Sequence, residues 1–127
     1  ITVGGGGIPV VDVGSGEYRG AAAVIDKADA ASLLARAVGA GLFLIATAVE
    51  KVAISFGKPD QRWIDRMSLA EAKRYLEQGG HFAAGSMAPK IRAIVEYLEA
   101  GGSQALITNP ENIGRAIKGE TGTLIVP

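Results

Sequence analysis

The sequence has 127 residues, of which 48% are hydrophobic, and its thirteen basic side chains balance thirteen acidic ones. This size and composition fit one globular domain with its own core, and the zero net charge disfavours nucleic acid or an anionic membrane as a partner. Cysteine is absent and histidine occurs once, which excludes thiolate chemistry and disfavours a histidine metal centre. The longest apolar runs are too short to span a bilayer. We therefore expect a soluble, cytoplasmic protein with no metal site of its own.

Four consecutive glycines, Gly4, Gly5, Gly6 and Gly7, follow a short apolar run at residues 1–3. Glycine lacks a Cβ and readily takes positive φ, so backbone N–H groups in such a loop can converge on a phosphate. The spacing is not that of a P-loop, because no Gly-Lys-Ser/Thr follows, and a plain flexible loop is the alternative. The chain starts without methionine and inside a predicted strand, so we expect a longer protein upstream.

A hairpin and a helix are expected next. Residues 10–13 and 18–25 flank a Gly-Ser-Gly turn, a pattern typical of a β-hairpin. From Asp26 the apolar residues recur three and four apart, which predicts a helix capped by Asp26 or Asp29. Lys27 then lies at a helix start beside exposed N–H groups, which makes a second local anion site.

The apolar run from Leu42 to Thr47 is typical of a strand buried on both faces of a parallel sheet. With the preceding helix it indicates a βαβ unit. Residues 47–51 would follow the carboxyl end of this strand, where open α/β sheets bind ligands. Residues 52–56 are expected to form a short strand.

The second half predicts two further amphipathic helices. A capping box begins at Ser68, and its helix is expected to end at Gly79. Another helix is expected to begin near Pro89, whose missing N–H suits a first turn, and to end at Gly101. Lys90 lies in or near that first turn, where a cation is unfavourable unless an anion is also bound. The remaining predicted elements are strands at 104–108 and 122–126 and a short helix at 110–118.

Seven short motifs run in one order along the chain. They are Gly-Gly-Gly-Gly-Ile-Pro-Val at 4–10, Tyr-Arg-Gly at 18–20, Val-Ile-Asp-Lys at 24–27, Phe-Gly-Lys-Pro at 56–59, His-Phe at 81–82, Gly-Ser-Met with Pro-Lys at 85–90, and Gly-Glu-Thr-Gly-Thr at 119–123. Together they resemble the carbamate kinases of the amino acid kinase superfamily. The resemblance implies a three-layer α/β/α sandwich with an open, mainly parallel sheet. It also implies that residues 1–127 are a single nucleotide-binding domain, the C-terminal lobe of a larger two-lobe subunit.

The resemblance implies reversible phosphoryl transfer between ATP, with Mg²⁺, and carbamate, giving carbamoyl phosphate and ADP. Such chemistry depends on positioning and on neutralising the charge of the moving group. Lys27 and Lys90 match the two lysines that face the transferred phosphoryl group in the family; solvated surface lysines are the alternative. The implied nucleotide-binding residues are Gly4, Gly5, Gly6, Gly7, Thr47, Ala48, Lys51, Val52, Phe56, Lys58 and Met87.

One position departs from the family pattern. An aspartate usually follows the motif lysine and orients the catalytic lysines, whereas here Ala28 has that place and Asp29 follows. Either Asp29 takes over this role or the carboxylate is missing. His81 is expected to pack or hydrogen-bond rather than to bind a metal, and Trp63 to cover the core or an interface rather than to stack on a nucleotide.

The N-terminal lobe, absent from this sequence, supplies part of the carbamate site in the family. The isolated chain is therefore either part of an active kinase or a non-catalytic nucleotide-binding module, and a related acid kinase with another acceptor is a third reading. The resemblance also implies a homodimer, a role in arginine metabolism, and no nucleic-acid or membrane partner.

Overall fold

The computed structural model describes residues 5–127, so the predicted strand at 1–3 and Gly4 lie outside the described residues. In chain order the elements are β1 (Val10–Gly14), β2 (Glu17–Gly20), α1 (Lys27–Ala37), β3 (Phe43–Ala46), β4 (Val52–Ile54), β5 (Arg62–Ile64), β6 (Arg66–Ser68), α2 (Leu69–Gln78), α3 (Met87–Glu99), β7 (Ala105–Thr108), the 3₁₀ helix η1 (Pro110–Asn112), α4 (Ile113–Ile117) and β8 (Thr123–Val126).

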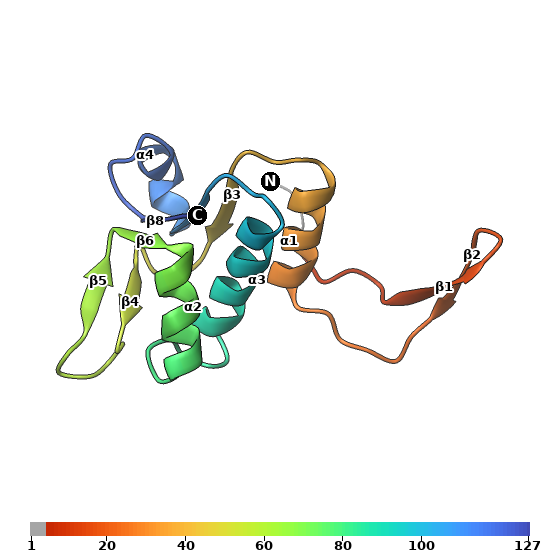
Figure 1. Cartoon of the computed structure of the whole chain (residues 1–127), viewed down its shortest axis with the longest axis horizontal. Coiled ribbons are helices and arrows are strands. Elements are labelled where there is room, and N and C mark those ends of the chain that lie inside the picture. The colour runs from red at the N-terminus through yellow and green to blue at the C-terminus, as the bar shows by residue number, and fades with distance from the viewer. Residues whose placement is uncertain (1–4) are drawn as a thin grey trace.

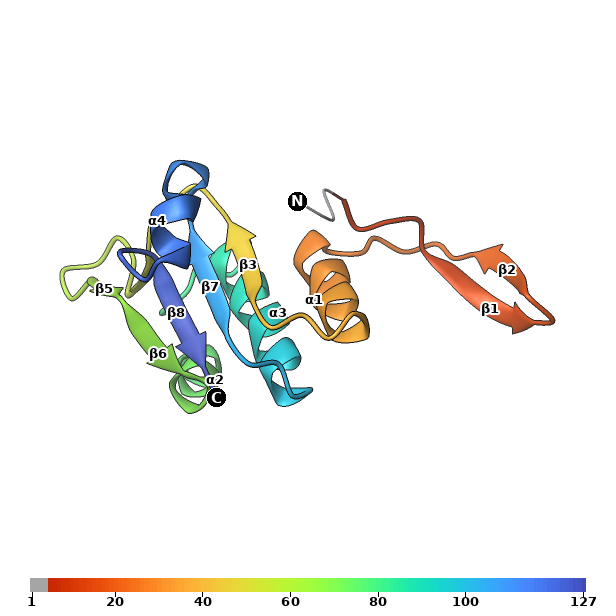
Figure 2. The ribbon, with the colours of Figure 1, turned by 90° about the horizontal axis from the view of Figure 1, so that it is seen from above.

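The hairpin of β1 and β2 projects away from the rest of the molecule, as Figures 1 and 2 show. The two strands pair antiparallel around a turn at Ser15 and Gly16. The predicted hairpin is confirmed, although its second strand ends at Gly20 and residues 21–25 form no strand. Every residue of both strands is exposed. A two-stranded hairpin alone is marginal in water, so this arm adds nothing to the core.

A four-stranded sheet in the order β3-β7-β8-β6 forms the centre of the fold (Figure 2). β3 runs parallel to β7 and β6 runs parallel to β8, whereas β7 and β8 are antiparallel. β7 is buried along its whole length, which fits its continuous apolar sequence and its inner place in the sheet. The predicted α/β class is confirmed, and its sheet is mixed, with parallel pairings in the majority.

Within residues 5–127, β3 is an edge strand and is not buried on both faces, which differs from the prediction. Phe43 is buried, but Leu44 and Ile45 are only partly buried and Ala46 is exposed. The only strand paired with β3 is β7, so no strand among these described residues pairs with its other side. An apolar run at such an edge is a template for pairing with a further strand.

Helices cover both faces of the sheet. α2 and α3 lie on one face and α4 on the other, as Figures 1 and 2 agree. α1 packs against α3 and against the β3 edge. The three-layer arrangement is therefore present, and in the described part of the chain one outer layer consists of α4 alone, a helix of five residues.

The buried face of α3 forms the centre of the core. Ile91 and Ile94 have no exposed surface, and the predicted apolar face of this helix is confirmed. The Tyr97 ring lies 5.3 Å from the Phe43 ring, centroid to centroid, and its hydroxyl donates a hydrogen bond to the Ala40 carbonyl. These contacts tie α3 to the chain that leads into β3.

β4 and β5 form a second, separate hairpin. The short strand predicted at 52–56 is confirmed from Val52 to Ile54, whereas β5 and β6 were not predicted. Strands of three residues are too short to show an alternating pattern, which explains why the sequence did not reveal them.

Of the helices that the structure describes, none combines the length and the apolar character needed to cross a membrane.

The predicted capping box at the start of α2 is confirmed. Ser68 Oγ accepts a hydrogen bond from the Glu71 N–H at 3.2 Å, and the Glu71 carboxylate accepts from the Ser68 N–H at 2.9 Å. The Ser68 hydroxyl also lies 2.9 Å from this carboxylate. The N–H bond, and after it the hydroxyl bond, hold the pKa of Glu71 below its ordinary value of 4.5.

Replacing Ser68 by alanine should lower the free energy of unfolding by about 1 kcal/mol, because the α2 terminus loses its cap. Glu71→Gln should also destabilise the protein at pH 7. Since folding lowers the pKa of Glu71, its contribution is full above pH 4.5 and is lost as the pH falls through the lower folded-state value. Urea unfolding at pH 7 and at about pH 3 should therefore show the difference between Glu71→Gln and wild type shrinking in acid.

Glu96→Gln, at an exposed position on α3, is the matched control. A penalty for Glu71→Gln that is equal at both pH values would contradict the capping interpretation.

Candidate functional site

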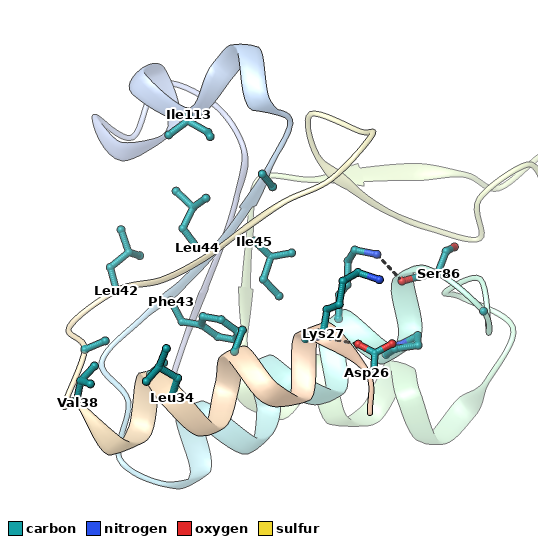
Figure 3. A pocket seen from close by; sticks show the side chains of 18 residues that line it. Asp26, Lys27, Leu34, Val38, Leu42, Phe43, Leu44, Ile45, Ser86 and Ile113 are labelled. Carbon is teal, nitrogen blue, oxygen red and sulfur yellow. Dashed lines mark hydrogen bonds between the residues drawn. The ribbon is translucent and has the colours of Figure 1, made fainter. Parts of the chain in front are cut away.

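An open groove of about 850 Å³ lies between α1, β3 and the first turn of α3 (Figure 3). Lys27, the first residue of α1, and Lys90, at the start of α3, both line it. In Figure 3, Lys27 points toward Ser86, whose backbone carbonyl accepts a 2.9 Å hydrogen bond from Lys90 Nζ. The fold thus brings the two lysines singled out in the sequence into one groove, and two ammonium groups there favour an anionic occupant.

The carboxylate in this groove belongs to Asp26. Its Oδ1 accepts a 2.7 Å hydrogen bond from the Ala28 N–H, so Asp26, not Asp29, caps α1. Asp29 lies in the first turn but is exposed and outside the groove lining. Ala28, which has the place of the family aspartate, does line the groove.

The positive charge at the start of α3 comes from its lysine side chain rather than from backbone amides. The N–H groups of Ser86, Met87 and Ala88 all donate to the Ala83 carbonyl, at 3.1 to 3.2 Å, and Pro89 has no N–H. Ser86 makes no side-chain capping bond to these amides. Because these amides have a partner already, an anion at this point would bind chiefly to ammonium groups.

The glycine loop requires glycine at two described positions, for different reasons. A Cβ added to Gly6 would overlap the carbonyl group of Ile25, because the two legs of the projecting hairpin pass close together there. Gly7 has φ of +81°, in the left-handed region that favours glycine. Gly5 has open space around it. Gly5, Gly6 and Gly7 lie outside the linings of both pockets described here, so their predicted part in phosphate binding remains a prediction.

A smaller pocket of about 100 Å³ adjoins the groove at the start of α3. It is lined by Val49, Lys51, Ala53, Phe56, Trp63, Ala83, Ser86 and Met87. Three of these, Lys51, Phe56 and Met87, were predicted to bind nucleotide. Ser86 lines both pockets, so the apolar pocket and the lysine groove meet at this residue.

Four other predicted nucleotide-binding residues lie outside both linings. Val52 is fully buried, and the Lys58 amine donates a 3.0 Å hydrogen bond to the Gly80 carbonyl. Thr47 and Ala48 follow β3 directly, beyond the last strand residue that lines the groove.

His81 and Trp63 have different outcomes. The His81 ring packs against Tyr75, and its Nε2 lies 3.1 Å from Gln78 Oε1, as expected of a packing or hydrogen-bonding residue. Half of the Trp63 surface is exposed and the side chain lines the small pocket, so the expectation that it covers the core or an interface stays a prediction. This placement has little signal in the sequence, because β5 is too short to show which face Trp63 occupies.

Within residues 5–127, no group of three or more histidine, aspartate or glutamate side chains is arranged to hold a metal ion.

A family model described as "Amino acid kinase family" matches residues 2–109 of the chain. The chain belongs to the amino acid kinase family. It is 50% identical to the carbamate kinase-like protein YahI of Escherichia coli over 126 residues, which cover 99% of this chain and 40% of that protein. It is also 50% identical over its whole length to the carbamate kinase of Thermoplasma volcanium, of which it covers 41%.

Solved structures of carbamate kinases share the fold of this chain. The structure of the Giardia lamblia carbamate kinase bound to AMP-PNP superposes with a TM-score of 0.86 at 40% sequence identity, covering 95% of this chain and 38% of that one. The predicted resemblance to carbamate kinases is therefore confirmed. The chain spans about 40% of the length of the curated relatives it matches.

Replacing Gly6 by alanine should loosen the contact between the two legs of the hairpin, because the new Cβ cannot share space with the Ile25 carbonyl. Hydrogen exchange of the amides around residues 6 and 25 should become faster than in wild type. Gly5→Ala is the control, since nothing lies near the added methyl group. Equal exchange in the two variants would show that the legs do not meet at Gly6.

Proposed function

We propose that this chain is the nucleotide-binding lobe of a carbamate kinase-like enzyme, which transfers a phosphoryl group reversibly between ATP and carbamate to give ADP and carbamoyl phosphate. The observation that carries the proposal is that a groove lined by Lys27 and Lys90 adjoins an apolar pocket at Ser86. A nucleotide has the same two parts, an anionic phosphate chain and a flat apolar base. The AMP-PNP bound to the Giardia carbamate kinase supports this reading.

In the proposed reaction, Lys27 and Lys90 neutralise charge on the transferred phosphoryl group. The protein need form no covalent bond, because phosphoryl transfer depends mainly on positioning and electrostatic stabilisation. The hydrogen bond to the Ser86 carbonyl holds the Lys90 amine at the groove. The carboxylate that orients these lysines is either Asp29, after a local shift of α1, or Asp26, which already lines the groove.

Magnesium enters this proposal as part of the MgATP or MgADP substrate. Mg²⁺ is commonly held by nucleotide phosphates and water with only one or two carboxylates, which suits a site where Asp26 is the one acidic side chain in the groove lining. The glycine loop, Gly4 to Gly7, would close over the phosphates. Four predicted residues lie outside both pocket linings and would support the nucleotide indirectly, by packing behind the residues that line the pockets: Thr47, Ala48, Val52 and Lys58.

The isolated chain has a second reading, as a nucleotide-binding module without catalysis. It is favoured by the chain's share of its relatives, about 40% of their length, because the remainder would supply the carbamate site. A related acid kinase with another acceptor is a third reading for the same reason. For the full-length protein we propose a homodimer that acts in the cytoplasm, in arginine metabolism.

The first test is calorimetric titration of the 127-residue chain with MgADP, beside an assay for ATP formation from MgADP and carbamoyl phosphate. Saturable binding of MgADP is the expected result. Binding without turnover would mean that the chemistry needs the rest of the protein, whereas turnover would place the acceptor site within this chain or its oligomer. Absence of binding would refute the proposed nucleotide lobe and leave the fold and family unchanged.

Replacing Lys90 by alanine should weaken AMP-PNP binding by about 10- to 100-fold, the range expected for a charge-assisted hydrogen bond, and should change ADP affinity much less. The contrast arises because only AMP-PNP carries the third phosphoryl position. Both dissociation constants are measured by calorimetry, with Lys118→Ala, at an exposed position outside both pocket linings, as the control. An equal loss for both nucleotides would assign Lys90 to the inner phosphates instead.

A further inference from the structure

Trp63 and Phe56 are two adjoining aromatic side chains left largely in contact with solvent. Trp63, the only tryptophan of the chain, is 50% exposed and Phe56 is 57% exposed. Their rings meet edge to face, with centroids 6.2 Å apart and an interplanar angle of 70°. Aromatic side chains gain much by leaving water, so a half-exposed pair beside a pocket is suited to contact with a flat ligand.

The pocket beside these rings is shaped by a small residue opposite a large one. Trp63 on β5 is paired in register with Ala53 on β4, and both residues line the pocket. Paired residues project from the same face of a hairpin, so the short Ala53 side chain leaves space next to the indole ring. Met87, from the first turn of α3, contributes a polarizable thioether to the same lining.

The charge in this lining is already compensated. Lys51 is the one charged side chain that lines the pocket, and its amine forms a 2.5 Å ion pair with Asp65. The pocket therefore favours a neutral, flat guest over a second anion. The adjoining groove at Ser86 has two lysines against one carboxylate and favours the opposite, which fixes the direction in which a nucleotide would lie.

We propose that Trp63 stacks on the base of the bound nucleotide and gives this site a preference for large, purine-type rings. The inference rests on the proposed function and adds to it a residue that contacts the base and contributes to specificity. It reverses the expectation from sequence that Trp63 covers the core or an interface. Phe56 supports the indole ring from its edge, and Met87 lines the pocket with it.

The single tryptophan allows a direct test, because every change in indole emission reports on Trp63. The chain is titrated with MgADP, with MgCDP and with magnesium tripolyphosphate, while tryptophan emission is followed and binding is measured in parallel by calorimetry. We expect MgADP to change the emission with the same dissociation constant that calorimetry gives. Tripolyphosphate, which lacks a base, should bind in the groove without changing it.

Two substitutions separate stacking from a structural role. Trp63→Ala should weaken MgADP binding by about 5- to 100-fold, the range of base–aromatic stacking, and should reduce the preference for ADP over CDP. Trp63→Phe should keep most of both, and tripolyphosphate affinity should be unchanged in either variant. Leu33→Ala, an exposed apolar position on α1 outside both pocket linings, is the matched control.

The failure of this inference differs from the failure of the proposed function. MgADP binding by calorimetry with no change in emission, and with unchanged affinity in Trp63→Ala, would overturn the stacking role and leave the nucleotide lobe intact. An equal emission change with tripolyphosphate would also overturn it, since the signal would then come from the phosphate end. Absence of MgADP binding would remove the proposed function and this inference together.

Discussion

The burial of α3 against α1, α2 and the sheet fixes where the first turn of this helix lies. Ile91 and Ile94 are completely buried, and Tyr97 joins the helix to the chain before β3 by a ring contact and a hydrogen bond. A helix held along its length in this way cannot rotate without losing core contacts, because protein interiors are close-packed. The backbone of Ser86, Met87 and Lys90 is therefore fixed, and the Lys90 amine is held by its hydrogen bond to the Ser86 carbonyl. Both pockets of the candidate site depend on this arrangement.

The open side of β3 is the second constraint. Much of the large groove is apolar, with Leu34 and Val38 of α1 and Leu42 and Leu44 near the strand among its lining residues, and this part lies along the edge rather than around the two lysines. A nucleotide phosphate chain is anionic and would gain nothing by contacting this apolar surface. In the part of the chain that the structure describes, β3 has an unpaired apolar edge beside this surface, which is suited to receive a further strand and its covering side chains.

Local signals in the sequence predicted the helices and three of the four strands of the central sheet, β3, β7 and β8. The capping box at Ser68 and the apolar period of α3 depend on neighbours within one or two turns, and both are present in the structure. The edge position of β3 could not be found in the same way, because an apolar run looks alike at a covered edge and at the centre of a sheet. The surroundings of Trp63 could not be predicted locally for a related reason: they are formed by Ala53 and Met87, which the chain brings near only through the β4–β5 turn and the α3 terminus.

The site itself was predicted unevenly. Lys27 and Lys90 could be singled out because each lies at a helix start within a recognisable motif, and the fold places both in one groove. The electrostatic environment of these lysines could not be predicted from the sequence. It depends on which carbonyl accepts the hydrogen bonds of the first α3 amides and on which aspartate accepts the hydrogen bond of the Ala28 N–H. The hydrogen-bond partners are determined by the local backbone geometry, which the residue types alone do not specify.

The projecting hairpin determines where the chain is most open to proteolysis. Its two legs, residues 5–9 and 21–25, have no regular secondary structure, and Val24 is 99% exposed. Beyond the hairpin itself, the Ala21 N–H to Pro9 carbonyl hydrogen bond and the approach of Gly6 to Ile25 hold the legs together. Exposed segments without secondary structure are where proteases cut first. A cut in the second leg would separate the glycine loop and the hairpin from the buried core, which begins at α1 and would stay whole, so a measurement that reports only on folding would not detect the cut.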